Sequence, residues 1–133
     1  MIIIITIGKT KEKYLKEGIE EFLKRIKRYE KIEYQEINTF DNLKLDNKFV
    51  IVLDVLGKEH SSEGLAEILK KTIGKEIIFL IGDQEGIKEE IKKKANLLLS
   101  ISRMTFTHEM ARLILLEQVY RAITINKGMK YHK

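Results

Sequence analysis

Hydrophobic residues gather in short runs along the chain. Ile2–Ile7, Phe49–Val55 and Glu76–Ile81 are apolar at almost every position and rich in β-branched residues, a pattern typical of strands buried on both faces of a parallel sheet. Ile32–Ile37 alternates apolar with polar residues, which predicts a more exposed strand at an edge of the sheet. Leu97–Ile101 predicts the last strand.

Between these runs, apolar positions recur at helical spacing. Four helices are predicted: Lys11–Arg28, a segment from Ser61 or Ser62 to about Ile73, Ile87–Lys94 and His108–Asn126. Strands that alternate with helices indicate a single α/β domain over residues 1–133, with a largely parallel sheet and helices on both faces. The tail, residues 127–133, has no apolar periodicity and is expected to be flexible.

The composition fits one ordered domain of 133 residues, 44% of them hydrophobic and 34% charged. The absence of cysteine excludes a disulfide framework, a thiolate metal site and a cysteine nucleophile. Only three His are present, without metal-binding spacing, so no metal site is expected. The first eight residues are too short for a membrane span or a signal peptide, and we expect a cytoplasmic protein. A net charge of +5 favours polyanionic partners.

The last predicted helix, His108–Asn126, is apolar around almost its whole circumference. Such a helix must be buried on most sides, and in so small a domain we expect a second copy of the chain to cover it. The sequence therefore predicts a homodimer through this helix. Glu117 and Arg121 lie four residues apart, where an intrahelical ion pair is expected.

Three connecting segments are expected at the carboxyl ends of the strands, where parallel α/β sheets bind ligands. They read LDVLGKEHSSEG, IGDQEG and ISRMTFTH. Glycine allows close approach of the backbone, and free N–H and C=O groups can read the edge of an adenine. The segments contain neither the dinucleotide fingerprint nor a P-loop.

The three His are the side chains that titrate near neutral pH. His60 is expected to be a solvated surface residue. His108 begins the last helix, where it is either a local hydrogen-bonding residue or a proton acceptor. Arg112 lies on the same helical face, four residues further on.

IIFLIGDQEG, LLLSISRMTFTHEMARLILLEQVYRA, the spacing between them and the terminal YHK closely resemble the ribosomal RNA large subunit methyltransferase H family, of the SPOUT class. IIIITIGKTKEKYLKEGIEEFLKRIKRY and LDVLGKEHSSEGLA extend the resemblance over nearly the whole chain. The resemblance implies a C-terminal trefoil knot, a homodimer, and S-adenosylmethionine-dependent methylation of N3 of pseudouridine 1915 in helix 69 of 23S rRNA.

Carried over by position, the resemblance assigns cofactor binding to Leu53, Gly82, Ile101, Ser102, Arg103, Met104, Thr105 and Phe106. For the N3 proton, His108 and His132 are the candidate bases. For the charge that spreads onto the flanking carbonyls, Arg112 and Arg103 are the candidate donors. The residues expected to contact the substrate RNA are Arg103, Lys130, Tyr131 and His132. In dimeric relatives such a tail is thought to reach the partner's cofactor pocket.

The chain departs from the family pattern at three places. Asp83 stands where a second Gly is usual, so it either strains the loop and obstructs the cofactor or faces the cofactor's cationic groups. Thr107 stands where Pro is usual and exchanges a rigid helix start for a hydroxyl cap. Asn38–Lys48 is shorter than in the family and lacks a helical insertion.

Three other functions are compatible with parts of this sequence. A receiver-like signalling domain requires an acidic pair after the first strand, where this chain has Gly8, Lys9 and Thr10, and is rejected. A non-catalytic, ribosome-associated RNA-binding protein of the same fold, with a cofactor loop spoiled by Asp83, stays an alternative. A SPOUT enzyme with another RNA target is a further alternative.

Overall fold

The computed structural model describes residues 1–133 and contains one sheet of five parallel strands. The strands are β1 (Ile2–Ile7), β2 (Ile32–Ile37), β3 (Phe49–Glu59), β4 (Ile77–Ile81) and β5 (Leu97–Ser100). Their order in the sheet is β2-β1-β4-β3-β5. The predicted parallel sheet is confirmed, and β2 lies at an edge, as its alternating pattern indicated.

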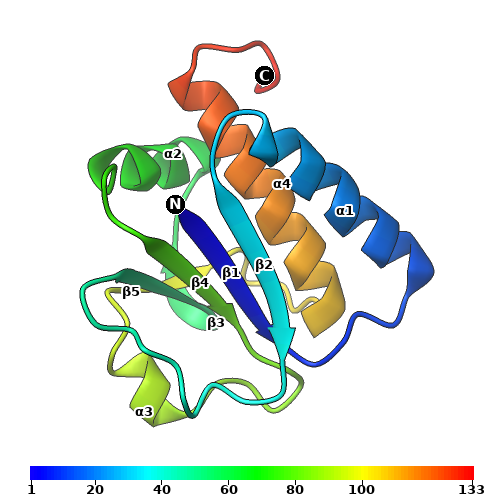
Figure 1. Ribbon diagram of the computed structural model, residues 1–133, viewed down its shortest axis with the longest axis vertical. Coiled ribbons are helices and arrows are strands. Elements are labelled where there is room, and N and C mark those ends of the chain that lie inside the picture. The colour runs from blue at the N-terminus through cyan, green and yellow to red at the C-terminus, as the bar shows by residue number, and fades with distance from the viewer.

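The helices are α1 (Lys13–Lys27), α2 (Ser62–Lys71), α3 (Glu89–Lys92) and α4 (His108–Asn126). Helices α1, α4 and α2 cover one face of the sheet, with α4 in the middle (Figure 1). The other face is covered by the short α3 and the β2–β3 connection, which contribute Ile91 and Phe40 to a smaller apolar cluster. Both faces are therefore covered, but most of the helical mass lies on one of them.

The chain itself buries most of α4. Leu115 and Val119 have no exposed surface, and Leu113 packs so closely on Gly18 of α1 that a Cβ there would lie 2.9 Å from Leu113 Cδ1. The position between α1 and α2 explains why α4 is apolar nearly all round, so this pattern by itself does not require a second subunit. What remains partly accessible on α4 is a stripe that includes Met110 and Ile114.

The tail, expected to be flexible, instead folds back on the second half of α4. The Tyr131 hydroxyl donates a hydrogen bond of 2.7 Å to Glu117, and its ring meets Tyr120 edge-on at 4.8 Å between centroids. The Arg121 guanidinium lies over the Tyr131 ring at 4.8 Å and forms the predicted ion pair with Glu117 at 2.7 Å. Apolar periodicity could not reveal these contacts because they join aromatic and charged groups.

Strand β3 runs further than predicted because it contains an excursion. Leu53 and Lys58 both pair with Leu99 of β5, so residues 54–57 bulge out of the ladder. At Gly57 a Cβ would lie 2.5 Å from the Leu98 carbonyl oxygen. Only glycine allows the two backbones to approach this closely.

Replacing Gly57 with Ala should therefore destabilise the protein. The added methyl group meets backbone that cannot move aside without separating β3 from β5, and overpacking of this kind costs about 1–3 kcal/mol. Urea denaturation measures the loss in the free energy of unfolding. Leu56→Ala is the matched control, since Leu56 is 89% exposed on the same excursion; similar losses in both variants would contradict the argument.

Candidate functional site

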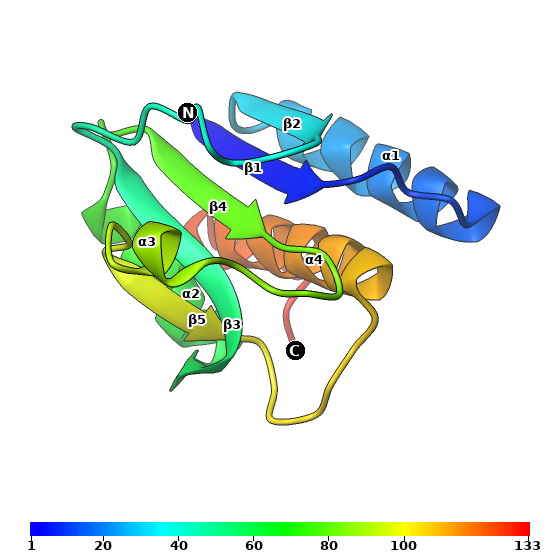
Figure 2. The ribbon, with the colours of Figure 1, turned by 90° about the horizontal axis from the view of Figure 1, so that it is seen from below.

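A cavity of about 780 Å³ lies at the carboxyl edge of the sheet, within the size range of small-molecule sites, roughly 300–1,000 Å³. Residues 53–55, 81–87 and 99–109 form most of its wall, and residues 12–15 of the β1–α1 connection and α1 close one side. Figure 2 shows the long segment that leaves β5, swings away from the sheet and returns to the start of α4. The three connecting segments singled out in the sequence therefore meet around one cavity.

The cavity combines an apolar floor with a polar mouth. Half of its lining residues are hydrophobic, and Leu53, Ile81 and Leu99 contribute from the ends of three strands. Ser102 and His108 are among the polar residues that line the same space. Such a lining suits a ligand with a flat, weakly polar part and a strongly polar part.

Free backbone groups border the cavity in residues 101–107. The Ser100 hydroxyl donates to the Ser102 carbonyl at 2.9 Å, and the Met104 N–H donates to the Ser102 hydroxyl at 3.0 Å, which fixes the shape of the segment. The N–H groups of Thr105 and Phe106 have no hydrogen-bond partner within the chain. They are available to a ligand that carries acceptors.

The loop after β4 is a tight turn closed by Asp83. The Gly86 N–H donates to the Asp83 carbonyl, and the Glu85 N–H donates to the Asp83 carboxylate, each at 3.0 Å. The left-handed position in this turn belongs to Gly86, with φ of 80°, and not to Asp83. The strain considered for Asp83 is therefore absent, and its carboxylate stabilises the turn.

Gly82 is required by the turn itself. A Cβ at this position would lie 2.9 Å from the Gly86 backbone and 2.8 Å from Ile87 Cγ1. A larger residue would therefore deform the loop that borders the cavity, whether or not a ligand is present.

Seven of the eight cofactor candidates line the cavity: Leu53, Gly82, Ile101, Ser102, Met104, Thr105 and Phe106. The eighth, Arg103, points its side chain into solvent, 89% exposed, with Nε 3.7 Å from a Glu59 oxygen. His108 also lines the cavity, directly after Thr107, whose hydroxyl caps α4 by accepting from the Met110 N–H at 3.1 Å. Of the candidate bases and donors, only His108 is at the cavity.

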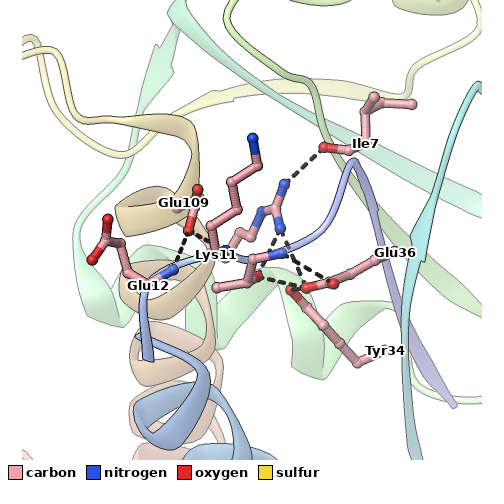
Figure 3. Close-up of polar contacts among 8 residues, drawn as sticks. Ile7, Lys11, Glu12, Tyr34, Glu36 and Glu109 are labelled. Atoms are coloured by element: carbon pink, nitrogen blue, oxygen red, sulfur yellow. Dashed lines mark hydrogen bonds and ion pairs between the residues drawn. The ribbon is translucent and has the colours of Figure 1, made fainter. Parts of the chain in front are cut away.

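Arg112 is completely buried and faces away from the cavity. Its Nη2 donates to the Ile7 carbonyl at 2.7 Å, and its Nη1 donates to the Thr10 hydroxyl at 2.7 Å and to Glu36 at 3.2 Å (Figure 3). These contacts engage both terminal nitrogens of the guanidinium, and only the buried Nε lacks a partner; the expectation that Arg112 donates to a substrate does not fit this arrangement. Arg112 instead holds α4 against the end of β1.

Glu109 makes a second attachment between the same elements (Figure 3). Its Oε1 accepts from the Lys11 N–H at 2.8 Å and the Glu12 N–H at 3.2 Å, just before α1 begins. Together, Glu109 and Arg112 fix the first turn of α4 to the connection that carries Glu12 and Tyr14 into the cavity wall. The role of Glu109 was not predicted from the sequence. Its two partners lie 98 and 97 positions away along the chain, and no local spacing indicates such a contact.

The carboxylates in these attachments have shifted pKa values. Burial acts to raise the pKa of Glu36, but hydrogen bonds from Thr10 and Tyr34, together with the Arg112 guanidinium, lower that pKa below 4.5. Burial, followed by the bond to Glu36, raises the pKa of Tyr34 to about 12. Burial also opposes the ionised form of Glu109, and two backbone N–H donors outweigh it and lower the pKa.

His132 lies far from the cavity of its own chain. It contacts Arg121 at 3.1 Å and Glu63 at 3.3 Å, near the end of α4 opposite the cavity (Figure 1). From His108 to Arg121 the helix advances roughly 20 Å at its standard rise. The structure therefore separates the two candidate bases.

Nowhere in the chain do three His, Asp or Glu side chains converge as they would around a metal ion. None of the helices has both the length and the hydropathy needed to cross a membrane.

Residues 1–132 match the model of a family described as predicted SPOUT methyltransferase. The chain belongs to the SPOUT methyltransferase family. A relative from Caldicellulosiruptor saccharolyticus is 42% identical over 154 aligned residues, covering 100% of both chains. Another from Prochlorococcus marinus (strain MIT 9515) is 45% identical over 130 residues, covering 98% of this chain and 93% of the relative. Both are named ribosomal RNA large subunit methyltransferase H, so the resemblance found in the sequence is confirmed.

Solved structures agree on the SPOUT fold. A probable methylase family protein from Haemophilus influenzae Rd KW20 superposes with a TM-score of 0.67 at 12% identity, covering 99% of this chain and 70% of that chain. A putative RNA methyltransferase from Bacillus anthracis superposes with a TM-score of 0.56 at 12% identity, covering 100% of both chains. At this identity the likeness concerns the fold alone.

Arg112→Met tests the buried attachment in this SPOUT family member. The substitution keeps most of the volume but removes the hydrogen bonds to Ile7, Thr10 and Glu36, and loss of hydrogen bonds from a charged group costs about 1.5–3 kcal/mol. Chemical denaturation should show this loss, and Glu36→Gln added to the same chain should restore part of it. Unchanged stability together with lost activity would instead indicate that Arg112 takes part in catalysis.

The lowered pKa of Glu36 predicts a specific dependence of stability on pH. Its contribution is fully present above pH 4.5, the ordinary value, and is lost as the pH falls through the lower folded-state pKa. Thermal unfolding at decreasing pH should therefore show a smaller acid-induced loss of stability in Glu36→Gln than in the parent. Glu33→Gln, on the exposed side of the same strand, is the control and should keep the parent's acid profile.

Proposed function

We propose that the chain methylates N3 of a pseudouridine in helix 69 of large-subunit rRNA, using S-adenosylmethionine, in the cytoplasm. The observation that carries this proposal is the cavity in which the three strand-end segments meet, with free N–H groups above an apolar floor. The names of the full-length relatives support the class of substrate. The trefoil knot implied by the family resemblance belongs to the same proposal.

The residues around the cavity fit the cofactor. Leu53, Ile81 and Leu99 offer an apolar bed for an adenine, and the N–H groups of Thr105 and Phe106 can donate to its ring nitrogens. When bound, S-adenosylmethionine supplies an electrophilic methyl group on a cationic sulfur. The size of the cavity, about 780 Å³, is sufficient for the cofactor and one extruded base.

His108 is the proposed acceptor of the N3 proton within the chain that holds the cofactor. It projects from the first residue of α4 into the cavity, where an imidazole can take a proton in its neutral form. Arg103 is exposed, and its neighbours Ser102 and Met104 line the cavity; it remains the proposed donor to the developing charge on the flanking carbonyls.

The tail is proposed to act on the cavity of a second copy of the chain. Lys130, Tyr131 and His132 are held at the far end of α4 and cannot reach their own cavity. The cavity also exposes large apolar side chains that a partner would cover: Tyr14, Val55, Met104 and Phe106. An exposed group of this kind is typical of an interface, and the half-buried Ile114 of α4 would extend it.

Mixing two inactive variants tests this arrangement. Gly82→Val destroys the cavity but keeps the tail, whereas His132→Ala keeps the cavity but loses the tail's imidazole. Mixed dimers combine one intact cavity with the partner's intact tail, so co-expression should restore up to about half of the parent activity per mixed dimer. No restoration, with both variants folded and dimeric, would show that the tail serves its own chain, and parent-like activity of His132→Ala alone would show that its imidazole has no part in the reaction.

The reaction itself is tested by incubating unmodified large-subunit rRNA with the protein and isotope-labelled cofactor. Mass spectrometry of helix 69 fragments should locate one added methyl group on the pseudouridine. A label elsewhere would favour an enzyme with another RNA target. Calorimetry that detects no cofactor binding at about millimolar concentration would favour the non-catalytic alternative, although the relaxed geometry of Asp83 speaks against it.

A further inference from the structure

The positive charge of this chain is concentrated in two short segments. Residues 24–31 and 127–133 together contain eight Lys and Arg but a single Asp or Glu, Glu30. The remaining 118 residues contain seventeen Lys and Arg and nineteen Asp and Glu. The net charge of +5 therefore comes entirely from these two segments, and the rest of the chain is slightly acidic.

The fold brings the two segments together. The end of α1 and the turn before β2 lie beside the end of α4 and the tail (Figure 1), and the Lys127 ammonium lies 5.8 Å from the centre of the Tyr29 ring. We call this surface the basic end; its cations are Lys24, Arg25, Lys27, Arg28, Lys31, Lys127, Lys130 and Lys133. Segments almost a hundred residues apart in the sequence thus form one surface.

Almost all cations of the basic end lack an anionic partner within the chain. Only Arg25 has an anionic partner, Glu21 at 2.8 Å, and the other seven form no ion pair. Those seven are all exposed. Some lysines elsewhere are paired, as in Lys92 with Asp54 at 3.1 Å and Lys48 with Glu76 at 2.8 Å. What distinguishes the basic end is that its unpaired cations are close together with a single acidic residue among them. Mutual repulsion of unpaired cations is unfavourable in the free protein, which points to an anionic ligand.

We propose that the basic end binds the phosphate backbone of the substrate RNA, an inference that rests on the proposed function and names where that substrate is held. Lys and Arg side chains that neutralise phosphates supply most of the non-specific affinity for nucleic acid. Tyr29, partly exposed among them, offers a ring on which an unpaired base can stack. The tail forms part of the basic end, so a tail that reaches the partner's cavity brings the phosphate-binding surface to the target base.

RNA fits this surface better than an anionic membrane does. Tyr29 is the only large hydrophobic side chain exposed within the two segments. A helix or turn that lies on a membrane inserts several apolar side chains between the headgroups, and the basic end has no such row.

The test compares two triple variants that lose the same charge. Lys27→Gln, Arg28→Gln and Lys31→Gln change the basic end, whereas Lys44→Gln, Lys93→Gln and Lys94→Gln change exposed lysines of the opposite face. The probe is a fluorescent RNA hairpin with the helix 69 sequence, titrated without cofactor at several salt concentrations. Each lost phosphate contact lowers the slope of log K against log salt by about 0.7–0.9, so the first triple should lower it by roughly 2 and weaken binding at least about tenfold.

Equal slopes and affinities for the two triples would overturn the proposal. The proposal would also be overturned if the protein bound phosphatidylserine vesicles more tightly than the hairpin and the first triple weakened that vesicle binding. The double variant Lys127→Gln, Lys130→Gln tests the tail half of the basic end independently, and it should lower the salt-dependence slope as well. Cofactor affinity, measured separately by calorimetry, should be the same in the two triple variants. A protein that binds no cofactor but shows the difference in slope would refute methyl transfer and leave the RNA-binding surface in place.

Discussion

The attachment of α4 to the end of β1 is the constraint on which the rest of the structure depends. Arg112 reaches out of the helix to the carbonyl of Ile7, to Thr10 and to Glu36, and Glu109 binds the two N–H groups that precede α1. A completely buried guanidinium is costly unless acceptors satisfy most of its donors, and the acceptors of its two terminal nitrogens come from three separate parts of the chain. The first turn of α4 is therefore fixed to β1, β2 and the start of α1 at once.

This attachment decides the form of the cavity. Residues 101–107 are held at one end by β5 and at the other by α4, so the position of α4 determines how far the segment stands off the sheet. Polar side chains contribute little to holding the segment, apart from the two bonds of Ser102. The cavity thus presents free backbone N–H groups of this segment beside the apolar side chains at the strand ends.

Local patterns in the sequence were sufficient to predict the helices and strands and the edge of the sheet at which the cavity lies. The β-branched runs predicted the strands, and the rule that ligands bind at the carboxyl ends of parallel strands selected the segments that meet there. Local patterns were insufficient wherever the structure depends on contacts between distant residues. Arg112 shares a helical face with His108 in the sequence, yet its partners lie 76 to 105 residues away and draw it into the interior. The packing of Tyr131 on Tyr120 and the coverage of α4 by α1 and α2 escaped prediction for the same reason.

The excursion in β3 lets the entrance of the cavity vary independently of the strand pairing in the sheet. Because Leu53 and Lys58 face the same residue of β5, Leu99, the number of residues between them has no effect on the register on either side. Insertions at Val55 or Leu56 would change the entrance while the pairing of β3 with β5 on either side stays in place. Evolution can thus remodel what is admitted to this site, provided that Asp54 keeps its ion pair with Lys92 and a glycine remains where the two backbones cross.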